Sequence, residues 1–324
     1  MRFSPPFADQ SPFSKILISI VVTVIFAFAF SLLSLVICSL VYGVKLADFM
    51  DLMNHLDDPA MLPSPKLMQT ISSIGTFILP PIFLAILFDG RPARYLQLSS
   101  KPKIMSFLIL GLLMLATIPI INWLSEINSH LALPSFLSSV EKWMKSSEEQ
   151  AAKLTDVFLN LNSFGELLFA LFMIALIPAI GEEFLFRGLL QKLLTQWMKN
   201  NHVAIFTTAA LFSAMHMQFY GFVPRMFLGV ILGYSVLWSG SLWISITGHF
   251  INNALAVTFT YLAKHDKISF DPDKLGSDSS QWYALVISII ISGILVLWLK
   301  KTGSNHKSVE VTPPTPLERG MFDM

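Results

Sequence analysis

The chain has 324 residues, of which 54% are hydrophobic and 13% are charged. Soluble domains carry about 25% charged residues, so this composition excludes an ordinary water-exposed globular surface. The net charge of +1 gives no indication of a nucleic-acid partner. The single cysteine, Cys38, excludes an intrachain disulfide and a metal site built from several cysteines.

Apolar runs follow one another along the chain and predict an all-α fold, a polytopic membrane helix bundle with about eight transmembrane helices. About 20 apolar residues in a helix cross the hydrocarbon core of a bilayer. The runs of suitable length are 16–44, 68–88, 104–124, 165–190, 203–219, 222–238, 242–262 and 283–299.

The charges between these runs predict an orientation. The loop 89–103 and the end of the last run are rich in Lys and Arg, whereas the loops on the other side mix Lys with many acids. The positive-inside rule therefore predicts that both termini are cytoplasmic. We expect a multi-pass protein of a cell membrane, and a bacterial inner membrane because no eukaryotic sorting signal is visible.

The order of the runs predicts four parts. Residues 1–163 would hold the first three transmembrane helices, their loops and a surface helix near 139–156. Residues 164–262 would form a core of helices four to seven. Residues 263–301 would be an outer loop and the eighth helix, and the proline-containing residues 302–324 a flexible cytoplasmic tail.

Ionisable residues at membrane depth are the strongest functional signal, because a charge in hydrocarbon costs at least a few kcal/mol. The fourth run carries Glu182, Glu183 and Arg187; the fifth carries Phe212 and His216; and the seventh carries His249 and Asn253. Residues four apart share a helix face, so Glu183 can pair with Arg187, and His249 and Asn253 point the same way.

Counting residues from the turns predicts that three of these side chains lie at one depth. Glu182 precedes Lys199 in the turn by 17 residues, and His216 follows it by 17. An antiparallel helical hairpin brings them to the same level, about 15 Å below the surface if the membrane begins near Lys192. His249 lies nine residues beyond Gly240, or about 13 Å deep.

This set suits hydrolysis of an amide. A carboxylate beside a histidine can activate water as a general base, and a second histidine with an amide side chain can stabilise an oxyanion. Alternatively, Glu182, His216 and His249 could bind a divalent metal such as zinc. The residues do not decide between these two chemistries, and neither needs an organic cofactor. The expected partners are the lipid bilayer and a membrane protein or lipidated peptide as substrate.

At these positions the sequence resembles the CPBP intramembrane protease family, which covers CAAX prenyl endopeptidases and bacteriocin-processing or Abi-type membrane proteins. The family pattern is Glu-Glu-x-x-x-Arg, then Phe-x-x-x-His, then His-x-x-x-Asn, and every position is matched here. The resemblance implies that Glu182 and His216 activate water and that His249 and Asn253 stabilise the oxyanion. It gives supporting roles to Glu183, Arg187 and Phe212.

Two other functions fit buried charges in a helix bundle. A membrane transporter or channel also places ionisable groups near the midplane. A non-catalytic membrane immunity or scaffold protein could keep the same pocket. The main prediction is an intramembrane endopeptidase, either glutamate-dependent or metal-dependent, in which Glu182 and His216 activate the attacking water.

Overall fold

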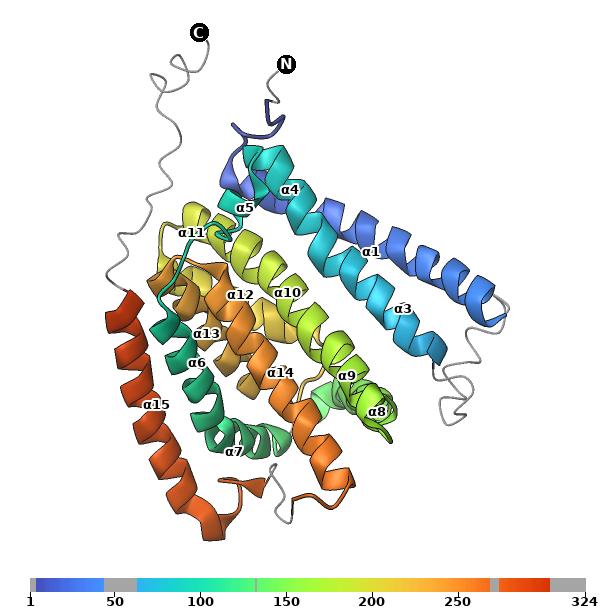
Figure 1. Cartoon of the computed structure of the whole chain (residues 1–324), viewed down its shortest axis with the longest axis vertical. Helices are drawn as coiled ribbons and strands as arrows, with labels where there is room; N and C mark the ends of the chain where they lie inside the picture. The colour runs from blue at the N-terminus through green and yellow to red at the C-terminus, as the bar shows by residue number, and fades with distance from the viewer. Residues whose placement is uncertain (1–3, 44–62, 132, 269–273, 304–324) are drawn as a thin grey trace.

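The computed structural model describes residues 4–43, 63–131, 133–268 and 274–303, and within these ranges it contains helices and no strand, which confirms the all-α prediction. The first half holds α1 (Pro12–Tyr42), α3 (Pro63–Ser73), η2 (Ile74–Ile78), α4 (Leu79–Asp89), α5 (Pro92–Tyr95), α6 (Ile104–Ala116), α7 (Ile118–Ser129), η3 (Ser135–Leu137) and α8 (Ser138–Leu159). The second half holds α9 (Phe164–Ala170), η4 (Leu171–Leu176), α10 (Ile177–Glu183), η5 (Phe184–Gln191), α11 (Lys192–Met198), α12 (Asn201–Met215), α13 (Phe222–Ser239), α14 (Leu242–Lys264), η7 (Ser279–Gln281) and α15 (Trp282–Gly303). Figure 1 shows α10 and α14 in the middle of the bundle, α15 at one edge, and α1 with α3 and α4 at the other.

Helices occupy all eight predicted runs, but the count of eight transmembrane helices is not confirmed. By length and composition, five described segments can cross a membrane: 12–42, 63–89, 164–198, 222–239 and 282–303. The bent pair of α6 and α7 would make a sixth. The two remaining runs became α12, which has 15 residues, and α14, which carries His249, Asn252 and Asn253. The helices that fall short of a simple span are therefore those that bring in the candidate site histidines.

The third predicted span is bent by 43° where α6 meets α7. Pro119 is the second residue of α7 and has no N–H to donate to the preceding turn. Thr117, at the break, donates its hydroxyl to the Met114 carbonyl. A proline near the break is the usual cause of so sharp a kink.

The fourth span is one continuous helix from Phe164 to Met198 with two wide turns in it. The π-helical segment η4 precedes Pro178, and the second, η5, begins directly after Glu183. Such π segments often occur at functional sites, because they change the direction in which neighbouring side chains point.

α12 and α13 form an antiparallel hairpin that packs closely through small residues. A side-chain carbon at Gly229 would lie 3.0 Å from the Ala209 Cβ, and one at Gly233 would lie 2.9 Å from the Ile205 Cγ2. Small residues four apart on an apolar helix are the usual means by which membrane helices approach each other. This contact sets the distance between the helix that leads to His216 and the helix that faces Arg187.

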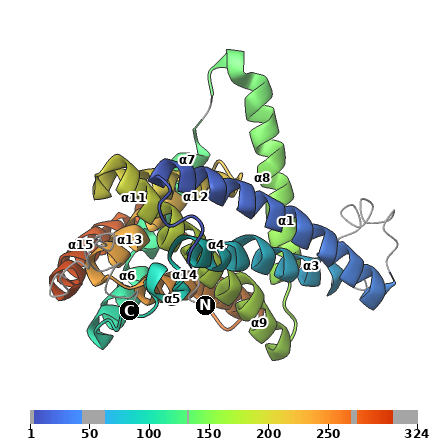
Figure 2. The same ribbon diagram turned by 90° about the horizontal axis from the view of Figure 1, so that it is seen from above.

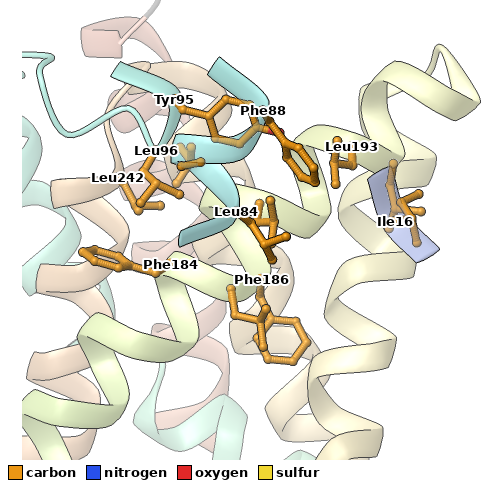
Figure 3. Close-up of a cluster of buried hydrophobic side chains, with 14 of the residues drawn as sticks. Ile16, Leu84, Phe88, Tyr95, Leu96, Phe184, Phe186, Leu193 and Leu242 are labelled. Atoms are coloured by element: carbon orange, nitrogen blue, oxygen red, sulfur yellow. The ribbon is translucent and has the colours of Figure 1, made fainter. Parts of the chain in front are cut away.

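A hydrophobic cluster packs around residues 184–194, in the C-terminal half of the fourth span. Figure 3 shows Phe186 of η5 below Leu84 of α4, Phe184 of η5 below Leu242 of α14, and Leu242 beside Leu96. The same cluster includes Ile16 of α1, Phe88 of α4 and Leu193 of α11. The first buried residue that the fourth span contributes to this cluster is Phe184, directly after Glu183. The cluster therefore fixes the position of the helix that carries Glu182 and Glu183.

The predicted surface helix near 139–156 lies within α8, which spans Ser138–Leu159 and projects from the helix bundle in Figure 2. The Lys145 ammonium donates to Glu141 on its exposed face and holds the pKa of that carboxyl below its usual range. Trp143 packs against Phe219 with tilted rings, whose centroids lie 5.2 Å apart. Glu148 accepts a hydrogen bond from the Tyr220 backbone. α8 therefore contacts the loop 217–221, which directly follows His216.

Two predictions fall largely on residues outside the described ranges. The flexible tail predicted for 302–324 lies there from residue 304 onward, and much of the acidic loop used for the orientation lies within 44–62. The division into four parts and the cytoplasmic placement of both termini stay predictions.

Candidate active site

The predicted site residues are delivered by three separate helical segments. Glu182 and Glu183 are the last two residues of α10, and Arg187 follows in η5. Phe212 lies in the last turn of α12, and His216 directly follows that helix. The third contribution, from α14, is His249 and Asn253.

Glu183 and Arg187 form a completely buried ion pair. The Arg187 Nη1 donates to the Glu183 Oε1 over 2.6 Å, and neither side chain has any exposed surface. The other terminal nitrogen of Arg187 donates to the Gly229 carbonyl of α13 over 3.3 Å. A buried arginine needs such partners, because an unpaired charge at this depth would be strongly destabilising.

His249 lies between the two glutamates. Its Nδ1 is 2.9 Å from the Glu183 Oε1, and its Nε2 is 3.7 Å from the Glu182 Oε2. Since a carboxylate only accepts hydrogen bonds, the Nδ1 carries a proton and donates it to Glu183. The Nε2 is therefore the ring nitrogen that faces Glu182.

His216, directly after α12, faces the same Glu182 oxygen. Its Nδ1 donates to the Phe212 carbonyl over 2.8 Å, and its Nε2 lies 4.0 Å from the Glu182 Oε2. The bond to Phe212 fixes the proton on Nδ1 and leaves the lone pair on Nε2 directed toward Glu182 in the neutral ring. His216 thus has the tautomer that a proton acceptor needs.

The site opens outward at His216. The His216 side chain is 30% exposed, against 13% for Glu182 and 7% for His249. The Glu182 Oε2 is itself buried and makes no hydrogen bond within the described part of the chain. Water or a substrate would therefore approach past His216 and meet a carboxylate oxygen with free acceptor capacity.

Phe212 lies at the centre of this cluster. Its ring meets His216 and His249 edge to face, with centroids 4.9 and 5.9 Å apart. The Arg187 guanidinium carbon lies 4.5 Å from the ring centroid, a distance suited to a cation–π contact. A single side chain therefore holds the two imidazoles and the guanidinium apart at fixed distances.

Asn253 is held by the fourth span. Its Nδ2 donates to the Ile174 carbonyl over 3.3 Å, and its Oδ1 accepts from Asn252. Pro178 lies four residues after Ile174 and has no N–H to donate to that carbonyl. The contact explains what Asn253 binds here, and its predicted part in stabilising an oxyanion stays a prediction.

One family of known proteins matches the part of the chain that carries these motifs. Residues 164–255 match the family described as Type II CAAX prenyl endopeptidase Rce1-like. The match contains all seven predicted site residues and confirms the resemblance. We call residues 164–255, which resemble this family, the Rce1-like core.

A relative of this Rce1-like core is an uncharacterized protein of Bacillus subtilis (strain 168), YpbD. It is 26% identical over 138 residues, which are 40% of this chain and 66% of the relative. The chain thus spans slightly less than two thirds of that relative's length. No solved structure gives a significant match to the chain.

Sequence reasoning missed the partners that α13 supplies to the Rce1-like core. Gly229 and Gly233 present carbonyls to Arg187 and Gln191, over 3.3 and 3.2 Å. These glycines form a Gly-x-x-x-Gly pattern in an apolar helix, which is a signal for close helix packing. The pattern could therefore have predicted the close approach of α13. It does not reveal that the Gly229 carbonyl accepts a hydrogen bond from the buried Arg187 guanidinium.

The predicted metal ligands Glu182, His216 and His249 would have to direct their donor atoms at one ion. Both imidazoles are anchored through Nδ1 and turn Nε2 toward Glu182, as metal-bound histidines often do. However, the described ranges contain no group of three or more His, Cys, Asp or Glu side chains placed to hold a metal ion. Glu182, His216 and His249 thus do not fit a metal in this arrangement, and zinc binding stays a prediction.

Proposed function

We propose that the chain is an intramembrane endopeptidase that hydrolyses a peptide bond of a membrane-associated substrate. The observation that carries the proposal is the Glu182 Oε2, a buried oxygen that accepts no hydrogen bond from the residues the structure describes. It lies 4.0 Å from the His216 Nε2 and 3.7 Å from the His249 Nε2. A general base must lie within reach of the proton it removes, either directly or through one water.

In the proposed reaction, Glu182 removes a proton from water while the water oxygen bonds to the substrate carbonyl carbon. The lone pair on the His216 Nε2 orients the same water by accepting its second hydrogen. The carbonyl oxygen becomes an oxyanion, which His249 stabilises through its Nε2 when that nitrogen carries a proton. The proton then passes from Glu182 to the amide nitrogen, the C–N bond breaks, and the products are a carboxylic acid and an amine.

The remaining predicted residues support these groups. Glu183 accepts a hydrogen bond from the Nδ1–H of His249 and so orients the ring, and Arg187 pairs with Glu183. Phe212 orients His216 through its carbonyl. Asn253 would add a second oxyanion donor by turning away from Ile174 when substrate binds.

The resemblance suggests the first substrates to test. The matched family is described by its action on prenylated CAAX proteins, so a lipidated C-terminal peptide is the starting point. An unmodified peptide of the same sequence shows whether the lipid is required.

The test uses purified protein reconstituted into liposomes with these peptides. Glu182→Gln and His216→Ala should each lower the cleavage rate by about 10²–10⁴-fold, the usual contribution of a general base. The matched controls are Glu126→Gln and His130→Ala, which alter an exposed Glu–His pair and should leave cleavage unchanged. Wild-type activity in a folded Glu182→Gln protein would refute the mechanism.

The same preparation separates the alternatives. Metal analysis together with cleavage in the presence of a chelator decides whether a metal is needed. Ion or solute flux without cleavage would favour a transporter or channel. Restoration of a deletion phenotype by Glu182→Gln would favour a non-catalytic immunity or scaffold role.

A further inference from the structure

A cavity of about 420 Å³ lies between α6, α13 and α15. Its apolar walls include Leu113 of α6, Val230 of α13 and Val296 of α15. We call this cavity the α13–α15 slot. Its volume falls in the range of roughly 300–1,000 Å³ that is typical of small-ligand sites.

The slot has polar groups at one end. Lys300, in the last turn of α15, lines it with an exposed side chain. His202 and Tyr234 lie there as well and share a hydrogen bond of 2.6 Å between the imidazole Nδ1 and the phenol oxygen. The Tyr234 ring stacks on Trp238, with centroids 5.1 Å apart. A cation and two hydrogen-bonding groups therefore surround the mouth.

The spacing of the lining residues along α13 and α15 shows how far the slot extends from its polar mouth into the bundle. Trp238 is eight residues from Val230 along α13, which is about 12 Å of helix. Lys300 is four residues from Val296 along α15, or about 6 Å. The apolar walls thus lie deeper in the bundle than the polar mouth, as acyl chains lie deeper in a bilayer than headgroups.

The mouth lies at the basic end of the bundle. It is formed by the end of α13, the start of α12 and the end of α15, with Lys300 and Lys301 in its last turn. Basic residues and aromatic side chains such as Trp238 are typical of the membrane interface. A cation at this level meets lipid phosphates.

The slot is distinct from the candidate active site. Gly229 and Gly233 face Arg187 and Gln191, whereas Val230 and Tyr234 are each one residue further along and about 100° round α13. None of the seven predicted site residues lines the slot. A ligand there would contact one face of α13, while a different face of the same helix binds Arg187.

We propose that the α13–α15 slot binds one anionic phospholipid, with an acyl chain between the apolar walls and its phosphate at Lys300. Charge complementarity favours this occupant, because a neutral apolar group would leave the ammonium and the His202–Tyr234 pair unused. The proposal does not depend on the proposed peptidase activity.

The test measures lipid retention by native mass spectrometry after the protein is moved from bilayers into mild detergent. The bilayers are phosphatidylcholine with or without phosphatidylglycerol. The wild type should retain phosphatidylglycerol in preference to phosphatidylcholine and should unfold at a higher temperature when it is present. Lys300→Gln should weaken this retention about fivefold, equivalent to about 1 kcal/mol for one basic residue near anionic lipid.

The controls separate this site from general surface charge. Lys301→Gln removes the neighbouring charge from a residue that does not line the slot and should change retention less than twofold. Val230→Trp fills the slot from α13 and should abolish retention, and Val296→Trp repeats the test from α15 if the first variant does not fold. Equal retention of both lipids, equal effects of Lys300→Gln and Lys301→Gln, or retention by both tryptophan variants would overturn the proposal.

Discussion

Arg187 is the residue whose role in stability can be tested most sharply. Its guanidinium is fully buried and is balanced by Glu183, so Arg187→Ala would leave an uncompensated carboxylate in the core. Breaking a buried pair in this way costs about 3–5 kcal/mol. We expect a clear loss of thermal stability, measured by unfolding of the purified protein in detergent.

The control for this prediction is another i,i+4 pair. Lys145→Ala removes the cation from the exposed pair with Glu141 on α8, and we expect the unfolding temperature to change little. If Arg187→Ala were as mild as Lys145→Ala, the buried ion pair would not be a structural requirement.

At the residue scale, the identities of the polar groups could be predicted but their partners could not. The pairing of Glu183 with Arg187 follows from their spacing, and the structure has it at 2.6 Å. The contact between Asn253 and Ile174 could not be predicted, because it depends on a backbone carbonyl near Pro178 in another helix. Periodicity identifies which side chains share a face, but it does not identify backbone groups that a proline leaves without their usual donor.

At the scale of single elements, the closeness of α12 and α13 depends on Gly233. A methyl group there would lie 2.8 Å from the Gln191 Oε1 and 2.9 Å from the Ile205 Cγ2. Gly233→Ala should therefore destabilise the protein by about 1–3 kcal/mol through overpacking. It should also lower cleavage, because α13 supplies the carbonyls that hold Arg187 and Gln191.

Gly293 provides the matched helical control. A methyl group at this position of α15 would meet no atom of the described residues within 4 Å, so Gly293→Ala should be neutral or stabilise the helix by about 0.5–1 kcal/mol. Unfolding temperatures of both variants check the prediction. Equal effects of the two substitutions would show that the α12–α13 contact is looser than the structure has it.

The loop 217–221 is the second element with a direct link to the site, because it starts immediately after His216. Asn128, buried at the end of α7, donates to the Phe219 carbonyl in this loop over 2.7 Å. Asn128→Ala should cost about 0.5–1.5 kcal/mol by removing one of the two hydrogen bonds that this carbonyl accepts, the other coming from the Phe222 N–H. We also expect slower cleavage with little change in KM, since His216 would be held less firmly.

Asn122 on the same helix is the control for this loop. Its Nδ2 donates to the Leu275 carbonyl over 3.0 Å, which is a similar bond to a different loop. Asn122→Ala should lower stability without a matching loss of turnover. A proportional loss of activity in both variants would mean that Asn128 acts through general stability alone.

At the scale of the whole molecule, each of the eight apolar runs found by hydropathy holds a helix, but the count of eight transmembrane helices is not confirmed. Five or six segments can cross a membrane by length and composition, because α12 ends at His216 and α14 carries polar residues in its middle. The same polar residues that weaken these helices as spans form the candidate site. Counting residues from the helix turns predicted that Glu182, His216 and His249 lie at one depth. The structure brings the three side chains together.

The central claim is that Glu182 and His216, from different helices, act on one water as a unit. The most direct measurement is the residual cleavage rate of Glu182→Gln, His216→Ala and the double variant in liposomes, side by side. Residues that act as a unit give strongly non-additive effects, so the double variant should be no slower than the slower single variant. Losses that multiply in the double variant, or wild-type cleavage by either single variant, would contradict the account.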